Sequence, residues 1–486
     1  MNRQIASLFR ISAVAFAVLI TFTAYWQIWA ADSLATRRDN ARLIYRQLQI
    51  RRGLIYAANG RTVLASNHER RRNGLNIFLR RYPYGPLFAH AVGYNTVGNG
   101  RTGLELAEND YLTASNSDLA TVVSRIGSEL QGETVTGDNV VTSLSVSAQR
   151  AAAAGMAGKV GAVVAIEPST GRVLAMYSSP TFSPQKVQQN FPKLARTSGA
   201  PLLNRATQGL YAPGSTFKTV TAAAALDTGL YGPDTPTIDA KGHCIVVQGL
   251  NLCNAGSESF GPISLTTALT FSVNTAFAQI GQQLGQNRLE EYMTRFGFFS
   301  DPPLTYPSDE MNPSGLYHNG HQLKPGAPVD VARVAIGQER LAVTPLQMAE
   351  VAATIGNGGE RMRPTLVDRV VSPGGRRVYT QQPEPLERVM SQRSAQELGT
   401  MMQNVVDEGT GTAARLNGLT VAGKTGTAET GVTGVNTAWF IAFAPVVNPK
   451  IAVAVVVEHT PLFGGQVSAP IAASVIEAYL GQGVAQ

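Results

Sequence analysis

The longest run of apolar positions lies near the start of the chain, at Ile11–Ala30, which holds twenty residues without a charge. A helix of that length, at about 1.5 Å per residue, spans the roughly 30 Å hydrocarbon core of a membrane. Arg10 precedes the run, and Trp26 and Trp29 lie at its far end, where tryptophan favours the interface. These bulky residues argue against a cleaved signal peptide. We therefore predict a cytoplasmic tail over residues 1–10, an uncleaved transmembrane anchor and an extracytoplasmic remainder.

The sequence after the anchor predicts a small pedestal. Residues 32–49 are polar with spaced apolar positions, which is typical of a helical stalk. Two short β-patterned runs then flank Asn59-Gly60, a pair that favours a tight hairpin turn. A break rich in Gly and Thr over residues 131–139 separates this part from a larger core. We expect a stalk and pedestal domain over residues 31–139.

The larger part of the chain begins and ends with strand-like runs, and helix-like sequence dominates between them. Strands from both ends of a segment, with helices between, are typical of an antiparallel sheet covered by helices. The pattern therefore predicts an α+β fold for residues 140–486. The strand-like runs are 161–166, 172–177, 438–444 and 451–458, and a closing helix with apolar positions from Ile471 to Leu480 follows them.

Composition excludes several function classes. The 486 residues are 44% hydrophobic and 15% charged, which suits a folded protein, and the net charge of +7 includes no long basic run of the kind that binds nucleic acid. The six histidines are scattered, so we expect no metal site and no cofactor. Cys244 and Cys253 are the only cysteines. Outside the membrane they either form a disulfide or remain two thiols, because sequence alone does not give the distance between their α-carbons.

A first candidate site is Pro213-Gly-Ser-Thr-Phe-Lys218, which leads into an Ala-rich helical run. Ser215 and Lys218 are three residues apart and share one face of a helix, whose N-terminus favours negative charge on the serine oxygen. A buried amine beside another cation loses its proton near neutral pH and can act as a base. The motif therefore fits a lysine-activated nucleophile, although a capping serine before a solvated lysine has the same pattern.

A second candidate is Ser272-Val273-Asn274, inside the helix-forming stretch 265–284. Alternate residues at a bend place a hydroxyl and a carboxamide on one side. The hydroxyl can relay a proton, and the carboxamide can hold a peptide amide through its donor and acceptor atoms. Two solvated polar residues on a helix are the alternative interpretation.

A third candidate is Lys424-Thr425-Gly426-Thr427. Because Gly426 has no side chain, an extended substrate backbone can lie directly along this strand. Lysine is uncommon in the chain, so the order and spacing of these three motifs are specific.

A rival motif overlaps the third candidate, because Gly418–Thr425 matches the phosphate-binding pattern G-x-x-x-x-G-K-[ST]. Such a loop opens a helix, whereas Gly426, Gly431 and Gly434 follow here and are poor helix formers. Sequence context therefore disfavours nucleotide hydrolysis.

Together these features resemble class B penicillin-binding proteins, the monofunctional transpeptidases, and among them the penicillin-binding protein A type of actinobacteria. The resemblance covers nearly the whole chain. Besides the three motifs it rests on Arg52, Gly53, Ile55, Asn59, Gly60, Leu64, Ala65, Tyr82–Gly85, Gly103–Glu105, Gly337-Gln338 and Trp439-Phe440. The chain departs from the family in having Ala57 and Ala58 in place of charged residues. It also has no glutamate element of the kind that deacylates class A β-lactamases, so a β-lactam should stay attached.

The resemblance implies a penicillin-binding, β-lactamase-like domain on a β-containing pedestal. It implies that Ser215 attacks the D-Ala-D-Ala carbonyl of a peptidoglycan stem peptide and that Lys218 takes its proton. It further implies that Ser272 relays the proton and that Asn274 binds the substrate amide. The terminal carboxylate, or a β-lactam in its place, would bind along Lys424, Thr425, Gly426 and Thr427. The backbone N–H groups of Ser215 and Thr427 would form the oxyanion hole. A membrane glycan polymerase and divisome or elongation proteins are the implied partners.

Two other functions share these motifs. A non-catalytic β-lactam sensor or division scaffold would have the same acylation residues but would need a cytoplasmic output, and only about ten residues precede the anchor. A D,D-carboxypeptidase differs only in using water rather than an amine to resolve the acyl-enzyme, which the motifs do not decide.

Overall fold

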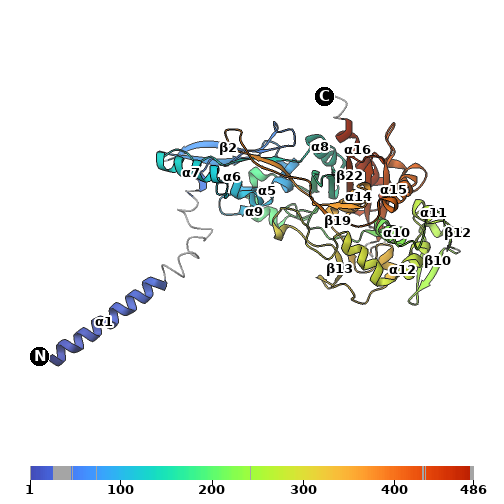
Figure 1. The fold of residues 1–486 in the computed structure, drawn as a ribbon, viewed down its shortest axis with the longest axis horizontal. Coiled ribbons are helices and arrows are strands. Elements are labelled where there is room, and N and C mark those ends of the chain that lie inside the picture. Colours follow the sequence, from blue (N-terminus) through green and yellow to red (C-terminus); the bar gives the residue numbers. More distant parts are fainter. Residues whose placement is uncertain are drawn as a thin grey trace.

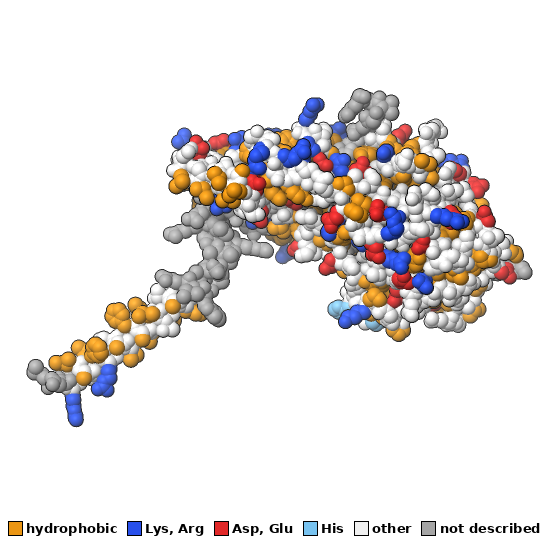
Figure 2. Space-filling model, in the orientation of Figure 1, with side chains coloured by type: hydrophobic (Ala, Val, Ile, Leu, Met, Phe, Trp, Pro, Cys, Tyr) orange, Lys and Arg blue, Asp and Glu red, His pale blue; other side chains and the backbone are white. Residues whose placement is uncertain are grey.

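The computed structural model begins with one long apolar helix. It is α1 (Asn2–Ala24), and it is long and apolar enough to cross a membrane from Arg3 onward. Figure 2 shows hydrophobic atoms along this separate rod. The helix begins earlier than expected, because no Gly or Pro interrupts the described part of the predicted tail. The predicted anchor residues 26–30 and most of the predicted stalk lie outside the described residues, which are 2–25, 45, 47–72, 74–240, 242–429, 432 and 434–481.

The pedestal contains a six-stranded sheet with the order β18-β17-β6-β1-β2-β3. The predicted hairpin at Asn59-Gly60 is confirmed, since Ile55 in β1 pairs antiparallel with Ala65 in β2. Two strands from much later in the chain complete the sheet, because β17 pairs with β6, and the sequence pattern did not predict this addition. The strands are β1 (Ile55–Tyr56), β2 (Val63–Arg72), β3 (Leu75–Arg81), β6 (Asn139–Thr142), β17 (Val367–Val371) and β18 (Arg377–Thr380).

A buried ion cluster joins the pedestal elements. Arg52 and Arg80 both form salt bridges with Glu105 in α5 (Gly103–Ala107), and Tyr82 donates a hydrogen bond to the same carboxylate at 3.3 Å. Burial by itself raises the pKa of Glu105, but the two arginines hold that pKa below its usual value.

The larger part contains a five-stranded antiparallel sheet with the order β20-β21-β22-β7-β8. Figure 1 labels β22 of this sheet among the helices α8, α14, α15 and α16. Its central strands are buried over most of their length and read as continuous apolar runs, which is why the sequence pattern located them. The predicted α+β fold is confirmed, with strands from both ends of the segment. The strands are β7 (Val160–Ile166), β8 (Val173–Ser179), β20 (Ala422–Glu429), β21 (Asn436–Ala444) and β22 (Ile451–Thr460).

Helices cover both faces of this sheet. On one face α8 packs against α16, and both contact the apolar side chains that include Val453 and Val455. On the other face α14 and α15 pack against β20, β21 and β22, around Trp439 and Ile441. The bounds are α8 (Val146–Gly155), α14 (Pro345–Gly356), α15 (Gln392–Asp407) and α16 (Gly464–Leu480). The closing helix was predicted and begins seven residues before the first of its expected apolar positions, at Gly464.

A helical subdomain lies between these strand groups in the chain. Its main helices are α10 (Lys218–Asp227), α11 (Leu265–Thr270), α12 (Asn274–Arg295) and α13 (Val331–Ala335). A short hairpin of β10 (Cys244–Val247) and β11 (Leu250–Cys253) lies beside them, and Cys244 and Cys253 form a disulfide. The three candidate motifs all lie where this subdomain meets strand β20.

Candidate functional site

Ser215 lies in a tight turn at the start of a buried helix. The turn η4 (Gly214–Phe217) leads directly into α10, as predicted for a serine that opens a helix. Gly214 has a φ of +52° and donates its N–H to the carbonyl of Gly337 at 2.9 Å. Ser215 is half-buried, and its hydroxyl has no hydrogen-bond partner in the described part of the chain. The turn therefore places Ser215 directly before the helix that carries Lys218.

Lys218 is completely buried one turn beyond Ser215. Its Nζ donates to Asn274 Oδ1 at 2.6 Å, to the Ser272 carbonyl at 2.7 Å and to Ser272 Oγ at 3.3 Å. It also lies 5.5 Å above the ring of Phe277. The structure thus brings the first and second motifs into direct contact.

The second motif lies at a break between helices and not inside one. Helix α11 ends at Thr270 and α12 begins at Asn274, so the expected single helical stretch is two helices. Ser272 has a φ of +59°, a backbone conformation that serine rarely adopts. The break turns both Ser272 and Asn274 toward Lys218, which a continuous helix does not do for residues two apart.

Lys424 completes the cluster from the sheet. It lies in β20, is completely buried, and donates from Nζ to Ser272 Oγ at 2.9 Å and to the Thr425 carbonyl at 3.0 Å. Ser272 Oγ therefore lies between the Nζ atoms of two lysines, within hydrogen-bond distance of each.

Burial lowers the pKa of both lysines. Burial lowers the pKa of Lys218 well below its ordinary value, and the nearby charge of Lys424 lowers it further. Burial lowers the pKa of Lys424 to about 7. A neutral amine at Lys218 can accept a proton, as a general base requires. Its hydrogen bonds in the structure go to Ser272 and Asn274 and not to the Ser215 hydroxyl.

Strand β20 forms an open edge beside the Ser215 turn. It is the terminal strand of its sheet, which allows an extended peptide to add alongside it. A Cβ atom at Gly426 would lie 2.6 Å from the Pro213 carbonyl and 3.1 Å from the Thr216 N–H nitrogen. Only glycine permits this contact between the third and first motifs.

The threonines of the third motif lie at the same edge. Thr425 shares a hydrogen bond of 2.6 Å with the hydroxyl of Thr410, and Thr427 Oγ1 accepts from the Gly464 N–H at 3.3 Å. A Cβ atom at Gly214 would lie 2.7 Å from the Thr427 carbonyl, so the backbones of the Ser215 turn and of Thr427 are adjacent. This adjacency suits two backbone N–H donors directed at one oxygen.

The structure contradicts the phosphate-binding interpretation of Gly418–Thr425. Lys424 and Thr425 lie inside strand β20, and no helix begins there; the strand continues to Glu429. The N–H groups of a helix N-terminus, which bind phosphate in such loops, are therefore missing at this place.

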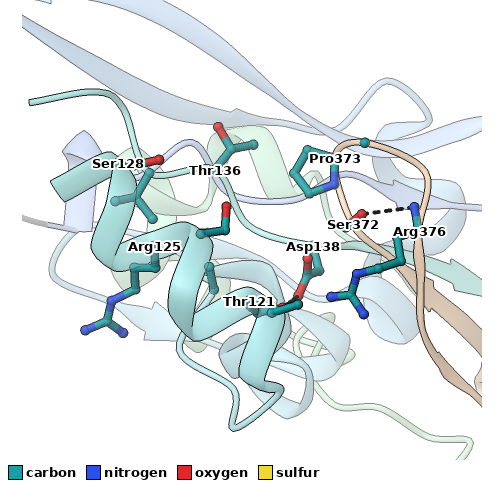
Figure 3. A pocket seen from close by; sticks show the side chains of 13 residues that line it. Thr121, Arg125, Ser128, Thr136, Asp138, Ser372, Pro373 and Arg376 are labelled. Carbon is teal, nitrogen blue, oxygen red and sulfur yellow. Dashed lines mark hydrogen bonds between the residues drawn. The ribbon is translucent and has the colours of Figure 1, made fainter. Parts of the chain in front are cut away.

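A separate cavity lies in the pedestal, between α7 (Leu119–Gln131) and the turn that joins β17 to β18. Its volume is about 300 Å³, and hydroxyl groups, Asp138 and Arg376 contribute much of its polar lining (Figure 3). None of the predicted site residues lines it.

Some residues at the site had no signal in the sequence. The carbonyl of Cys253 accepts a hydrogen bond from Asn274, Asn254 binds the Thr275 N–H, and Thr410 binds Thr425. These contacts join segments that are between 15 and 21 residues apart, and no periodic pattern or motif predicts them.

Two protein-family models match the chain. The penicillin binding protein transpeptidase domain matches residues 161–477, and the penicillin binding protein A dimerisation domain matches residues 52–140.

Relatives of the chain match over nearly full length. It is 36% identical to the peptidoglycan D,D-transpeptidase PbpA of Mycolicibacterium smegmatis, over 97% of this chain and 98% of the relative. It is 34% identical to the protein of the same name from Mycobacterium tuberculosis, over 98% and 99%. The ceftriaxone acyl-enzyme complex of penicillin-binding protein A from M. tuberculosis matches with a TM-score of 0.81 at 34% identity, over 90% of this chain and 99% of that chain. The penicillin G acyl-enzyme complex of the same protein matches with a TM-score of 0.79.

Proposed function

The chain belongs to the penicillin-binding protein transpeptidase family, and from this premise we propose that it is a peptidoglycan D,D-transpeptidase that forms its acyl-enzyme at Ser215. The expected resemblance to class B enzymes of the A type is confirmed by the two family models and the full-length relatives. The enzyme class is that of a serine acyltransferase, and β-lactams are its covalent inhibitors.

One observation supports the proposal most directly, namely that Lys218 and Lys424 both reach Ser272 Oγ beside a serine that opens a helix. In the reaction, neutral Lys218 takes the proton of Ser215 as Oγ attacks the carbonyl of the penultimate D-Ala. Ser272 passes that proton to the leaving amine of the terminal D-Ala. An ester to Ser215 remains, and a neighbouring stem amine then attacks it.

Several residues around that ester bind the substrate. Asn274 holds a substrate amide, while Lys424 and the hydroxyls of Thr425 and Thr427 hold the terminal carboxylate. The stem peptide lies extended along the edge of β20 at Gly426, where no side chain obstructs it. The backbone N–H groups of Ser215 and Thr427 stabilise the oxyanion, and each such donor contributes roughly 3 kcal/mol to the transition state.

The organisation of the chain fits an extracytoplasmic enzyme. We assign a cytoplasmic tail to residues 1–10, an anchor to 11–30, a stalk and pedestal to 31–139 and the transpeptidase domain to 140–486. The apolar helix α1 supports the anchor. A membrane glycan polymerase that supplies new strands, together with divisome or elongation proteins, is the partner class that such an enzyme requires.

A peptide-turnover assay tests the reaction. The full chain in detergent is given a stem pentapeptide that ends in D-Ala-D-Ala and a second stem with a free amine, and products are separated by mass. We expect a cross-linked dimer and one D-Ala for each cross-link. Release of D-Ala without dimer at saturating amine would identify a carboxypeptidase, and absence of both products would contradict the proposal.

A further inference from the structure

The disulfide-linked hairpin reaches the second motif. Strands β10 and β11 pair around a turn at Gln248-Gly249, where φ is +49° and +78°. Cys244 and Cys253 lie directly opposite each other at the end of the hairpin away from the turn. The disulfide therefore cross-links the end that faces the helical subdomain.

Residues at the cross-linked end of the hairpin form hydrogen bonds with the start of α12. The carbonyl of Cys253 accepts a hydrogen bond from Asn274 Nδ2 at 2.8 Å, while Asn274 Oδ1 accepts from Lys218. A carboxamide nitrogen has two hydrogens, so one remains for a substrate carbonyl. Asn254 Oδ1 accepts from the Thr275 N–H at 2.9 Å. Because the N-cap residue Val273 provides no side-chain cap, Asn254 caps the helix from outside.

Besides the disulfide, the hairpin is held by a hydrogen bond of 2.7 Å from the Asn254 N–H to the His243 carbonyl and by the packing of Val247 and Leu252 into the core. It is a separate two-stranded sheet, and such a hairpin is marginally stable by itself in water. Val246 is 69% exposed and Leu250 is 65% exposed, which leaves Val247 and Leu252 as its buried side chains. A disulfide across this end reduces the conformational entropy of the unfolded hairpin and so favours the paired strands.

We propose that the Cys244–Cys253 disulfide is a positioning element for Asn274, and that its reduction slows the acylation of Ser215. This inference rests on the proposed function. Cys253 is exposed, so a soluble reductant can reach the bond. With a phosphine, the S–S bond breaks, phosphorus supplies two electrons, and water supplies two protons for the thiols and the oxygen of the phosphine oxide. The Cys253 carbonyl then loses its fixed place beside Asn274.

The test compares second-order rate constants for acylation by a fluorescent penicillin. The samples are the full chain in detergent, the same chain after phosphine treatment, the double variant Cys244→Ser/Cys253→Ser, and Val246→Ser as a control that changes the exposed part of the hairpin. Since a misplacement of about 1 Å costs up to roughly a hundredfold in rate, we expect a fall of about ten- to a hundredfold for the treated chain and the double variant. Val246→Ser should match the untreated chain.

A pH profile separates positioning from general loss of structure. Without Asn274 Oδ1 as an acceptor, the ammonium of Lys218 is less stabilised, so the acid limb of the acylation profile should move to lower pH. Rates within twofold of the untreated chain, or a slower rate with an unmoved acid limb, would overturn the inference. If the untreated chain is not labelled at all, the proposed function itself fails, which is a different result.

Discussion

The two buried lysines provide a quantitative test, because removing one charge should change the pH at which the other becomes a base. Ser272 Oγ lies 3.3 Å from Lys218 Nζ and 2.9 Å from Lys424 Nζ, so the two nitrogens are at most about 6.2 Å apart. At an effective dielectric constant of about 20, two unit charges at that separation repel by roughly 2.7 kcal/mol, or about two pKa units.

The substitution Lys424→Met removes this repulsion. The protonated form of Lys218 is then less destabilised, so its pKa rises and its base form appears only at higher pH. The effect is largest below pH 7, because Lys424 has a pKa of about 7 and is itself neutral above it. We therefore expect the acid limb of the acylation profile to move upward by about two units.

The assay is the second-order rate constant of penicillin acylation, measured from about pH 5 to about pH 9. Each profile is normalised to its maximum, since we also propose that Lys424 binds substrate. Lys424→Arg is the matched control below pH 7, because it keeps the positive charge that Lys424 has there and should not move the limb upward. The reasoning is refuted if the Met profile superimposes on that of the unmodified chain, or if both variants shift equally.

Other parts of the structure give independent predictions. Glu105→Gln leaves two buried arginines without their carboxylate and should lower the free energy of unfolding by about 3–5 kcal/mol; an unchanged denaturant midpoint would contradict the buried cluster. Gly426→Ala places a Cβ atom 2.6 Å from the Pro213 carbonyl and should lower the acylation rate at least about tenfold, whereas Gly127→Ala, in open space on α7, should not. Deletion of residues 2–25 should release the protein from membranes, as measured by alkaline extraction and sedimentation; continued sedimentation with lipid would count against the anchor.

The sequence located those features that periodicity or a short motif encodes. Strands such as 161–166 and 451–458 were predictable because short continuous apolar runs bounded by turn residues are typical of buried strands. The positive φ of Ser272 was not predictable, because no local pattern specifies it and the side chain contacts Lys218 and Lys424, which are distant in the chain. Strand β17 was missed in the pedestal for the same reason, since its partner β6 lies more than two hundred residues earlier.

Proposed site residues could be named from the motifs, but their distances could not. The sequence placed Lys218 one helical turn after Ser215, whereas the approach of Lys424 to Ser272 joins residues 152 positions apart. The contact between Cys253 and Asn274 depends on the packing of a surface hairpin, which no local pattern specifies.

The central claim is that Ser215 is the acylated nucleophile, and the most direct test is mass analysis of the penicillin-treated chain. Intact mass and peptide mapping are measured for the unmodified chain, for Ser215→Ala and for Ser308→Ala, an exposed serine outside the motifs. We predict one penicillin adduct, mapped to the peptide that contains Ser215, in the unmodified chain and in Ser308→Ala, and none in Ser215→Ala. An adduct retained in Ser215→Ala, or mapped to any other residue, would contradict the account.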